Sequence, residues 1–212
     1  MKHPTYVTDK ALKQFIKSAL EEDIQSGDHS TLSTIPSDLM QSAKLLVKED
    51  CILAGVELAE IIFKTFDKNL KIEVFIKDGE NAKVGDIAFI VTGKAQSILS
   101  TERLVLNCMQ RMSGIATLTH DWDSRLIGTK TKLLDTRKTT PNFRICEKWA
   151  VSIGGGTNHR YGLYDMIMLK DNHIDYNGSI TNAVKMTQQY LKKNKLKLKV
   201  EVETRNLAEV EE

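Results

Sequence analysis

The sequence predicts a mixed α/β protein, with an N-terminal α+β sandwich-like domain over residues 1–100 and an open α/β barrel, incomplete here, over residues 101–212. Two observations carry this prediction. Short strand-like runs and single helical periods alternate without a fixed interval up to about residue 100. Three apolar strand-like runs then follow at intervals of about 30 residues, the length of one βα unit. Such a rhythm is typical of parallel α/β structures.

The first domain begins with apolar side chains at helical spacing over residues 1–25. A polar loop is expected at 27–38 and a helix at 56–66. Short apolar or alternating runs predict five strands, at 45–47, 51–53, 70–76, 85–93 and 95–100.

The second domain opens with a long helix over residues 100–122, for which Ser100 or Thr101 is the expected N-cap. Strands are expected at 131–136, 165–170 and 198–203, separated by helices over 143–151 and 179–193. Thr140 and Pro141 suit the start of the first of these helices, and three glycines at 154–156 suit its end. A closed barrel takes about 250 residues, so we expect the last barrel units to be missing and the final residues to start another helix.

The composition is that of a globular protein, with 41% hydrophobic residues, 27% charged residues and a net charge of +2. This balance gives no overall field that would attract nucleic acid. No apolar run approaches the ~20 residues of a membrane span, and the first residues lack a secretory signal. Cys51, Cys108 and Cys146 are scattered, which argues against a disulfide framework or a zinc site and favours a reducing cytoplasm.

Charged residues follow all three strands of the second domain. Arg137 and Lys138 follow the first, Lys170 ends the second, and Glu201 and Glu203 share one face of the third. The carboxyl ends of barrel strands form the active face, so we expect these charges to converge there. The alternatives are solvated surface charge for the arginine–lysine pair, a salt bridge from Lys170 to Asp171 or Glu203, and an edge-strand solubility device for the glutamates.

The stretch "LLDTRKTTPNFRICEKWAVSIGGGTNHRYG", residues 133–162, combines adjacent cations, threonines and glycines. Arginine offers a planar fork to carboxylate or phosphate, and lysine offers a point charge. We therefore expect a site for a small molecule with two or three negative charges. The three glycines end a helix or allow close approach to a ligand, and His159-Arg160 is either a second clamp or a hydrogen-bonded loop pair. The glycine patterns of nucleotide triphosphate and dinucleotide sites are lacking.

Three segments, "STERLVLNCMQRMSGIATLT", "DTRKTTPNFRICEKWAVSIGGGTNHRYGLYDMIMLKDNHI" (residues 135–174) and "VEVET", resemble the quinolinate phosphoribosyltransferases, also called nicotinate-nucleotide pyrophosphorylases (carboxylating). Weaker similarity in "LEEDIQSGDHST" and "ILAGVELAEIIF" extends the resemblance over nearly the whole chain. Asn142 stands where the family pattern has a glycine or a similar small residue after the proline.

The resemblance implies a pentosyltransferase of NAD biosynthesis that converts quinolinate and phosphoribosyl pyrophosphate to nicotinate mononucleotide, pyrophosphate and CO2. It implies Mg²⁺ as a cofactor. Because the sequence has no dense carboxylate or His/Cys ligand motif, we expect Mg²⁺ to be held mainly through the substrate pyrophosphate and not at a metal site built by the protein alone. The resemblance also implies a homodimer or an assembly of dimers in which Arg103 enters the neighbouring subunit's site. No nucleic acid or membrane partner is expected.

The resemblance also assigns roles to residues by position. Lys138, Lys170 and Glu203 are the expected catalytic residues. The residues expected to bind the substrates are Arg103, Arg137, Lys138, His159, Arg160, Lys170, Glu201 and Glu203. Two other functions remain open: a related barrel phosphoribosyltransferase that uses another base, and a non-enzymatic protein that binds a phosphate or dicarboxylate.

Overall fold

The computed structural model describes residues 3–212 as two compact units, the first ending at His159 and the second spanning Arg160–Glu212. The first unit contains two small antiparallel sheets and five helices, and the second contains a pair of parallel strands with three helices. The mixed α/β fold class predicted from the sequence is confirmed. The predicted domain boundary at residue 100 falls within a helix, and it stays a prediction.

The main sheet of the first unit has three antiparallel strands in the order β1-β5-β3. These are β1 (Met40–Leu46), β5 (Ile87–Lys94) and β3 (Lys71–Val74). The central strand β5 pairs with a strand on both sides, and its Ala88, Phe89 and Val91 side chains are buried in the apolar core. A second, two-stranded sheet pairs β2 (Cys51–Ile52) with β4 (Asn81–Ala82).

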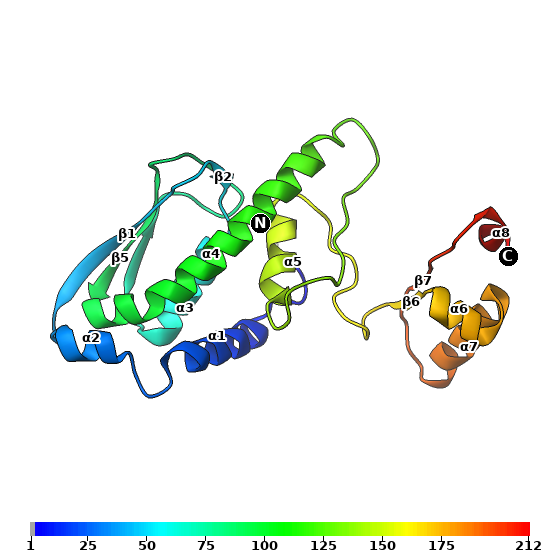
Figure 1. The fold of residues 1–212 in the computed structure, drawn as a ribbon, viewed down its shortest axis with the longest axis horizontal. Helices are drawn as coiled ribbons and strands as arrows, with labels where there is room; N and C mark the ends of the chain where they lie inside the picture. Colours follow the sequence, from blue (N-terminus) through cyan, green and yellow to red (C-terminus); the bar gives the residue numbers. More distant parts are fainter. Residues whose placement is uncertain (1–2) are drawn as a thin grey trace. The chain divides into compact units, whose positions relative to one another are not determined.

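The helices of the first unit are α1 (Asp9–Ile24), α2 (His29–Thr34), α3 (Val56–Phe66), α4 (Ala95–Ser124) and α5 (Arg144–Ile153). Figure 1 shows α4 running beside the sheet, with α5 against its C-terminal half. α3 also packs on α4, so the helices and the main sheet share one apolar core. α1 and α3 confirm the predicted helices, although α1 begins only at Asp9.

The predicted strand at 95–100 is wrong, because these residues form the first turns of α4. Ala95, Ile98 and Thr101 are buried at helical spacing, and a six-residue apolar window does not distinguish this pattern from a strand. Neither Ser100 nor Thr101 caps the helix. The Thr101 hydroxyl instead donates to the Ser97 carbonyl oxygen at 2.7 Å, inside the helix.

Two further expectations about local structure fail. The segment predicted as a polar loop at 27–38 contains α2, whose N-cap Asp28 accepts a hydrogen bond from the Thr31 amide at 3.0 Å. In place of the predicted strand at 131–136, the structure has one isolated parallel bridge between Leu134 and Thr157.

The loop before α5 also differs from the prediction. Phe143, not Thr140, occupies the N-cap position of α5. Asn142 has a φ of 61°, in the left-handed region that asparagine tolerates better than most residues, which explains the small residue expected there.

The three glycines after α5 serve close packing against α4. A Cβ atom at Gly154 would lie 2.3 Å from the Ala116 carbonyl oxygen, and one at Gly156 would lie 2.8 Å from a Thr119 side-chain atom. Gly155 has a φ of +97°, which most other residues cannot adopt. The glycines thus end α5 and let the following chain cross α4 at short distance.

The second unit contains β6 (Ile167–Leu169), α6 (Asp171–Asn177), α7 (Ile180–Lys193), β7 (Val200–Val202) and α8 (Leu207–Glu211). β6 and β7 pair in parallel with Met168 opposite Glu201, which agrees with the predicted parallel strands. Ser179 caps α7 as the N-terminal residue of the predicted helix. The sequence did not predict α6, which follows Lys170 directly.

Candidate functional site

Residues 135–140, which we call the cationic loop, carry Arg137 and Lys138 between two buried carboxylates. Lys138 is exposed, and its amide donates to the Thr136 hydroxyl at 3.1 Å. Arg137 is partly buried, and its Nε atom makes no hydrogen bond to any of residues 3–212. A buried donor without an acceptor is costly, so this guanidinium is suited to an anionic ligand.

Asp135 anchors the start of the cationic loop. Its side chain is 7% exposed and forms an ion pair with Lys148 of α5, whose side chain is 1% exposed. The same carboxylate accepts hydrogen bonds from the Asn158 side chain at 2.7 Å and the His159 amide at 2.8 Å. The loop is therefore tied directly to the segment that carries His159.

The amide of Asn158 joins three further groups. Its Nδ2 atom donates to the Lys148 carbonyl oxygen at 2.8 Å as well as to Asp135. Its Oδ1 atom accepts from the Tyr6 hydroxyl at 2.8 Å and from the Ser152 hydroxyl at 3.4 Å. An aspartate at this position could not donate, so the two-sided hydrogen bonding requires the amide.

Glu147 anchors the end of the cationic loop. Its side chain is 8% exposed and accepts from the Thr140 amide at 2.9 Å and from the Thr140 hydroxyl at 2.8 Å. Arg111 of α4 donates to the same carboxylate from Nη2 at 2.9 Å and from Nε at 3.1 Å. Burial raises the pKa of Glu147, but the hydrogen bonds from Thr140 and Arg111 outweigh it and lower the pKa below its ordinary value.

In the second unit, Lys170 and Glu203 meet at the ends of β6 and β7. They form an ion pair, with the side chains 44% and 55% exposed. The Glu203 amide donates to the Leu169 carbonyl oxygen at 2.9 Å, which extends the strand pairing by one residue. Of the partners that the sequence left open for Lys170, the structure selects Glu203.

Three more groups in the second unit bear on the predicted site. His173 accepts from the Lys170 amide at 2.9 Å, which fixes the start of α6. Arg160 is half-buried and donates from Nη1 to the Met166 carbonyl oxygen at 3.4 Å. Glu201 is exposed on β7.

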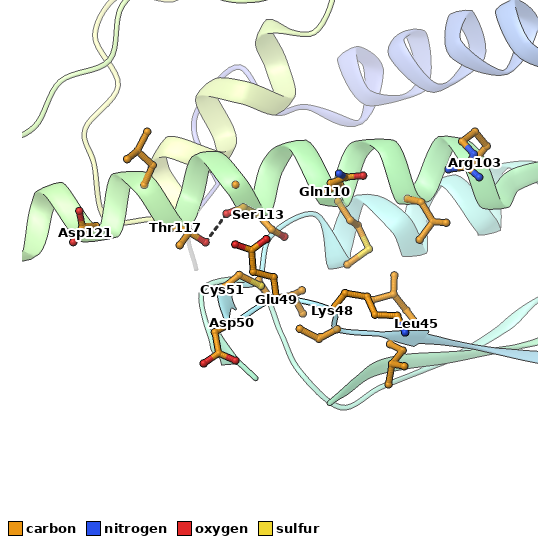
Figure 2. Close-up of a pocket in the computed structure, with 17 residues that line it drawn as sticks. Leu45, Lys48, Glu49, Asp50, Cys51, Arg103, Gln110, Ser113, Thr117 and Asp121 are labelled. Carbon is orange, nitrogen blue, oxygen red and sulfur yellow. Dashed lines mark hydrogen bonds between the residues drawn. The ribbon is translucent and has the colours of Figure 1, made fainter. Parts of the chain in front are cut away.

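Arg103 lies in the third turn of α4, on an exposed part of the helix. The helix that was predicted to begin at residue 100 begins at Ala95, so Arg103 is not in the N-terminal turn. Arg103 lines a cavity of about 740 Å³ between α4 and the segment 45–53. Figure 2 shows Arg103 at one end of this cavity, and Glu49 and Asp50 lie with Cys51 further along it.

Among residues 3–212, no group of three or more histidine, cysteine, aspartate or glutamate side chains is arranged to hold a metal ion. Within the same range, none of the helices has the length and apolar character needed to cross a membrane.

Two family models match nearly all of the chain. The model described as "Quinolinate phosphoribosyl transferase, N-terminal domain" matches residues 28–113, and that of the C-terminal domain matches residues 115–212. The solved structure of NadC from Streptococcus pyogenes superposes with a TM-score of 0.89 and 38% identity, covering 98% of this chain and 73% of that one. The chain belongs to the quinolinate phosphoribosyltransferase family.

Plant members of the quinolinate phosphoribosyltransferase family are more similar in sequence. A mitochondrial quinolinate phosphoribosyltransferase (decarboxylating) 2b of Nicotiana tabacum is 49% identical, covering 99% of this chain and 58% of the relative. A chloroplastic nicotinate-nucleotide pyrophosphorylase (carboxylating) of Oryza sativa is 50% identical, covering 99% of this chain and 55% of the relative. The chain thus spans somewhat more than half the length of these two relatives.

Within this member of the quinolinate phosphoribosyltransferase family, the structure brings some of the predicted site residues together. The Asp135 anchor links Arg137 and Lys138 to His159, and an ion pair links Lys170 to Glu203. The roles of the eight predicted residues in binding and catalysis stay predictions.

Sequence reasoning missed the buried groups that hold the cationic loop: Asp135, Glu147, Lys148 and Asn158. One signal was available for two of them. Glu147 and Lys148 are adjacent opposite charges between the apolar residues Cys146 and Trp149, where the apolar face of a helix was expected. Charged side chains at such positions need partners.

Proposed function

We propose that this protein is a quinolinate phosphoribosyltransferase, which joins quinolinate to the ribosyl carbon of phosphoribosyl pyrophosphate and releases pyrophosphate and CO2. One observation carries the proposal beyond family membership. The partly buried Arg137, whose Nε atom has no hydrogen-bond partner among residues 3–212, lies in a loop with Lys138 that is tied to His159. This arrangement suits a ligand with closely spaced negative charges.

The chemistry of quinolinate explains why such a site needs fixed cations. Its two carboxylates are neighbours on a pyridine ring, so they repel each other and are strongly hydrated. A binding site must replace that hydration with charge-assisted hydrogen bonds, for which the planar arginine fork is well suited. We assign Arg103, Arg137, His159 and Arg160 to these carboxylates.

The reaction needs charge stabilisation and no nucleophilic side chain. The ring nitrogen of quinolinate attacks C1 of the ribose, the bond from C1 to the pyrophosphate oxygen breaks, and the pyrophosphate departs with the electron pair. Lys138 and Lys170 stabilise the negative charge on the phosphates, and Glu203 favours the positive charge that develops on the sugar. The cationic ring then stabilises the electron pair that stays on the ring carbon when the bond to the adjacent carboxylate breaks and CO2 leaves, and a proton from water bonds to that carbon.

The described residues fit Mg²⁺ bound chiefly by substrate. Magnesium prefers oxygen ligands and keeps part of its water shell, so it commonly binds through one or two carboxylates and substrate phosphates. Residues 3–212 hold no cluster of three ligating side chains, but Glu201 and Glu203 supply carboxylates around the end of β7. When bound, Mg²⁺ would supply positive charge to the pyrophosphate.

We also propose that the protein works as a homodimer, or as an assembly of dimers, in which Arg103 serves the partner's site. Support comes from the exposure of Arg103 beside an open cavity whose lining includes the apolar, exposed Leu46 and Leu118. A two-fold dimer makes such a contribution reciprocal. We further propose that the protein is located in a reducing compartment, the cytoplasm. The three free cysteines support this proposal.

The activity is tested by incubating the protein with quinolinate labelled in its carboxylates and with phosphoribosyl pyrophosphate. We expect labelled CO2 and pyrophosphate in equal amounts. Turnover with a different pyridine or base would favour the related barrel transferase. Quinolinate binding without turnover would favour a non-enzymatic binding protein, and either result would contradict the proposed reaction.

The clamp is tested with Arg137→Lys and Arg160→Lys, which keep the charge but lose the planar fork. We expect calorimetry to show quinolinate binding weakened by about 1–3 kcal/mol, the value of a charge-assisted hydrogen bond. Arg125→Lys is the matched control, since Arg125 pairs with Asp121 in an exposed i,i+4 contact on α4. Unchanged affinity in both clamp variants would remove these arginines from the site.

The shared site is tested by mixing two inactive variants, Arg103→Ala and Lys138→Ala. In a mixed dimer one site receives both defects and the other receives neither, so random exchange returns about a quarter of wild-type activity. Mass spectrometry verifies that subunits have exchanged. If they have exchanged and no activity returns, Arg103 acts within its own chain.

A further inference from the structure

Helix α5 carries two adjacent, oppositely charged side chains that are both buried. The Glu147 side chain is 8% exposed and the Lys148 side chain is 1% exposed. Removing a charge from water costs several kcal/mol unless a partner compensates it. Consecutive helix residues project about 100° apart, so the two side chains reach different partners.

These partners are the two ends of the cationic loop. Lys148 pairs with Asp135, the first residue of the loop. Glu147 accepts two hydrogen bonds from Thr140, the last residue of the loop. Two neighbouring positions on one helix thus hold both ends of the segment that carries Arg137 and Lys138.

The anchors also leave the positive charge of the loop uncompensated. Lys148 is balanced by Asp135, and Glu147 is balanced by Arg111 of α4. Among the ion pairs described for residues 3–212, none uses Arg137 or Lys138. Buried charges thus hold the two ends of the loop, while its own two cations form none of these ion pairs.

We infer that Glu147 and Lys148 are positioning residues that pre-organise the cationic loop for anion binding. Fixing the backbone of a residue costs conformational entropy. When folding has already fixed the loop, ligand binding does not bear that cost, and affinity rises. The inference rests on the proposed function only for the identity of the anion.

The test uses two variants that keep side-chain size while weakening the anchors. Glu147→Gln removes the charge that holds Thr140 and Arg111. The double variant Asp135→Asn with Lys148→Met replaces the buried ion pair by neutral groups. The matched control is Asp78→Asn, because Asp78 is a partly buried carboxylate that accepts from the Val56 and Glu57 amides at 2.8 and 3.1 Å, at the start of α3.

Four quantities are measured in each variant: kcat, KM for both substrates, unfolding by urea, and hydrogen exchange of the Thr140 and His159 amides. We expect kcat/KM for quinolinate to fall roughly 10- to 100-fold in the two anchor variants, as when reacting groups shift by about 1 Å. Amide exchange should accelerate at Thr140 in the first variant and at His159 in the second. The control should keep its kcat/KM within about twofold, even where its loss of stability matches theirs.

Two outcomes would overturn the inference. In one, amide protection is lost but kcat/KM stays equal to that of the control, so loop order does not matter for catalysis. In the other, kcat/KM falls equally in the control, so stability alone explains the loss. If the wild type does not turn over quinolinate, the proposed function fails. The affinity of the wild type and of the two anchor variants for inorganic pyrophosphate is then measured instead. Unchanged pyrophosphate affinity in both anchor variants would then refute positioning.

Discussion

Two lysine–carboxylate pairs, one in each unit, have the same chemistry and opposite surroundings. Lys148 and Asp135 have side chains only 1% and 7% exposed, and Asp135 accepts two more hydrogen bonds from Asn158 and His159. Lys170 and Glu203 are 44% and 55% exposed. The first pair is part of the frame that holds the cationic loop, and the second lies at a strand end where substrate is proposed to bind.

The difference teaches how this family member divides its charges between support and chemistry. A buried charge that loses its partner is left in a medium of low polarity. Removing one partner of a buried ion pair therefore destabilises the protein strongly. An exposed pair contributes little net free energy and can give up its partner to a ligand. Charges that hold a site are thus expected inside the protein, and charges that serve a substrate are expected at its surface.

The largest effect should come from breaking the buried pair. We expect Lys148→Met to lower the free energy of unfolding by about 3–5 kcal/mol, because it leaves the Asp135 carboxylate buried without its cation. Lys170→Met, at the exposed pair, should cost less than about 1 kcal/mol. Urea unfolding of both variants measures the contrast. Equal losses would mean that burial does not separate the two pairs.

A middle-sized effect should come from the contact that seats α5 on α4. Gly154→Ala forces a Cβ atom to within 2.3 Å of the Ala116 carbonyl oxygen. We expect a loss of about 1–3 kcal/mol, as for other overpacked sites. Gly114→Ala is the control, since its added Cβ would meet no heavy atom within 4 Å apart from its chain neighbours and the adjacent backbone of its own helix. This change should stabilise α4 by about 0.5–1 kcal/mol.

These two glycine variants are compared by thermal or urea unfolding. If Gly154→Ala proved as stable as the wild type, α5 would not be held closely against α4. The frame around the cationic loop would then be looser than the buried ion pairs require.

The smallest effect should be on how the free energy of unfolding depends on pH at low pH, and it tests the role of the Glu147 charge. Its pKa is lowered in the folded state, so its stabilising contribution is complete above the unfolded value of about 4.3. The contribution is lost as pH falls through the folded pKa. We expect the difference in unfolding free energy between wild type and Glu147→Gln to shrink between about pH 5 and pH 3. A difference that stays constant over this range would show that the Glu147 charge adds nothing.

Periodicity predicted the elements that are long or regularly repeated. Helices α1 and α3 and the parallel pair of β6 and β7 follow from apolar spacing alone. The prediction for 95–100 was wrong because a window of six residues is too short to distinguish the periodicity of a helix from that of a strand. The prediction for 131–136 was wrong because a strand also needs a neighbouring strand to pair with, and only one bridge forms there.

The candidate site was predicted less completely than the fold. Residues that carry charge beside glycine and threonine, such as Arg137 and Arg160, could be identified from the sequence and the family resemblance. The adjacent charges of Glu147 and Lys148 indicated that these two residues need partners, but the partners themselves could not be identified, because each pairing depends on the fold. Asp135 meets Lys148 from 13 residues away, and Thr140 meets Glu147 from seven residues away.

The network around Asn158 has a consequence for the chemical ageing of the protein. Asparagine deamidates when the backbone nitrogen of the next residue attacks its side-chain carbonyl carbon. Here that nitrogen belongs to His159 and donates to Asp135, while both polar atoms of the Asn158 amide are also engaged. Spontaneous deamidation would set a second carboxylate against Asp135, and the same hydrogen bonds that build the site hold the attacking atom away from this reaction.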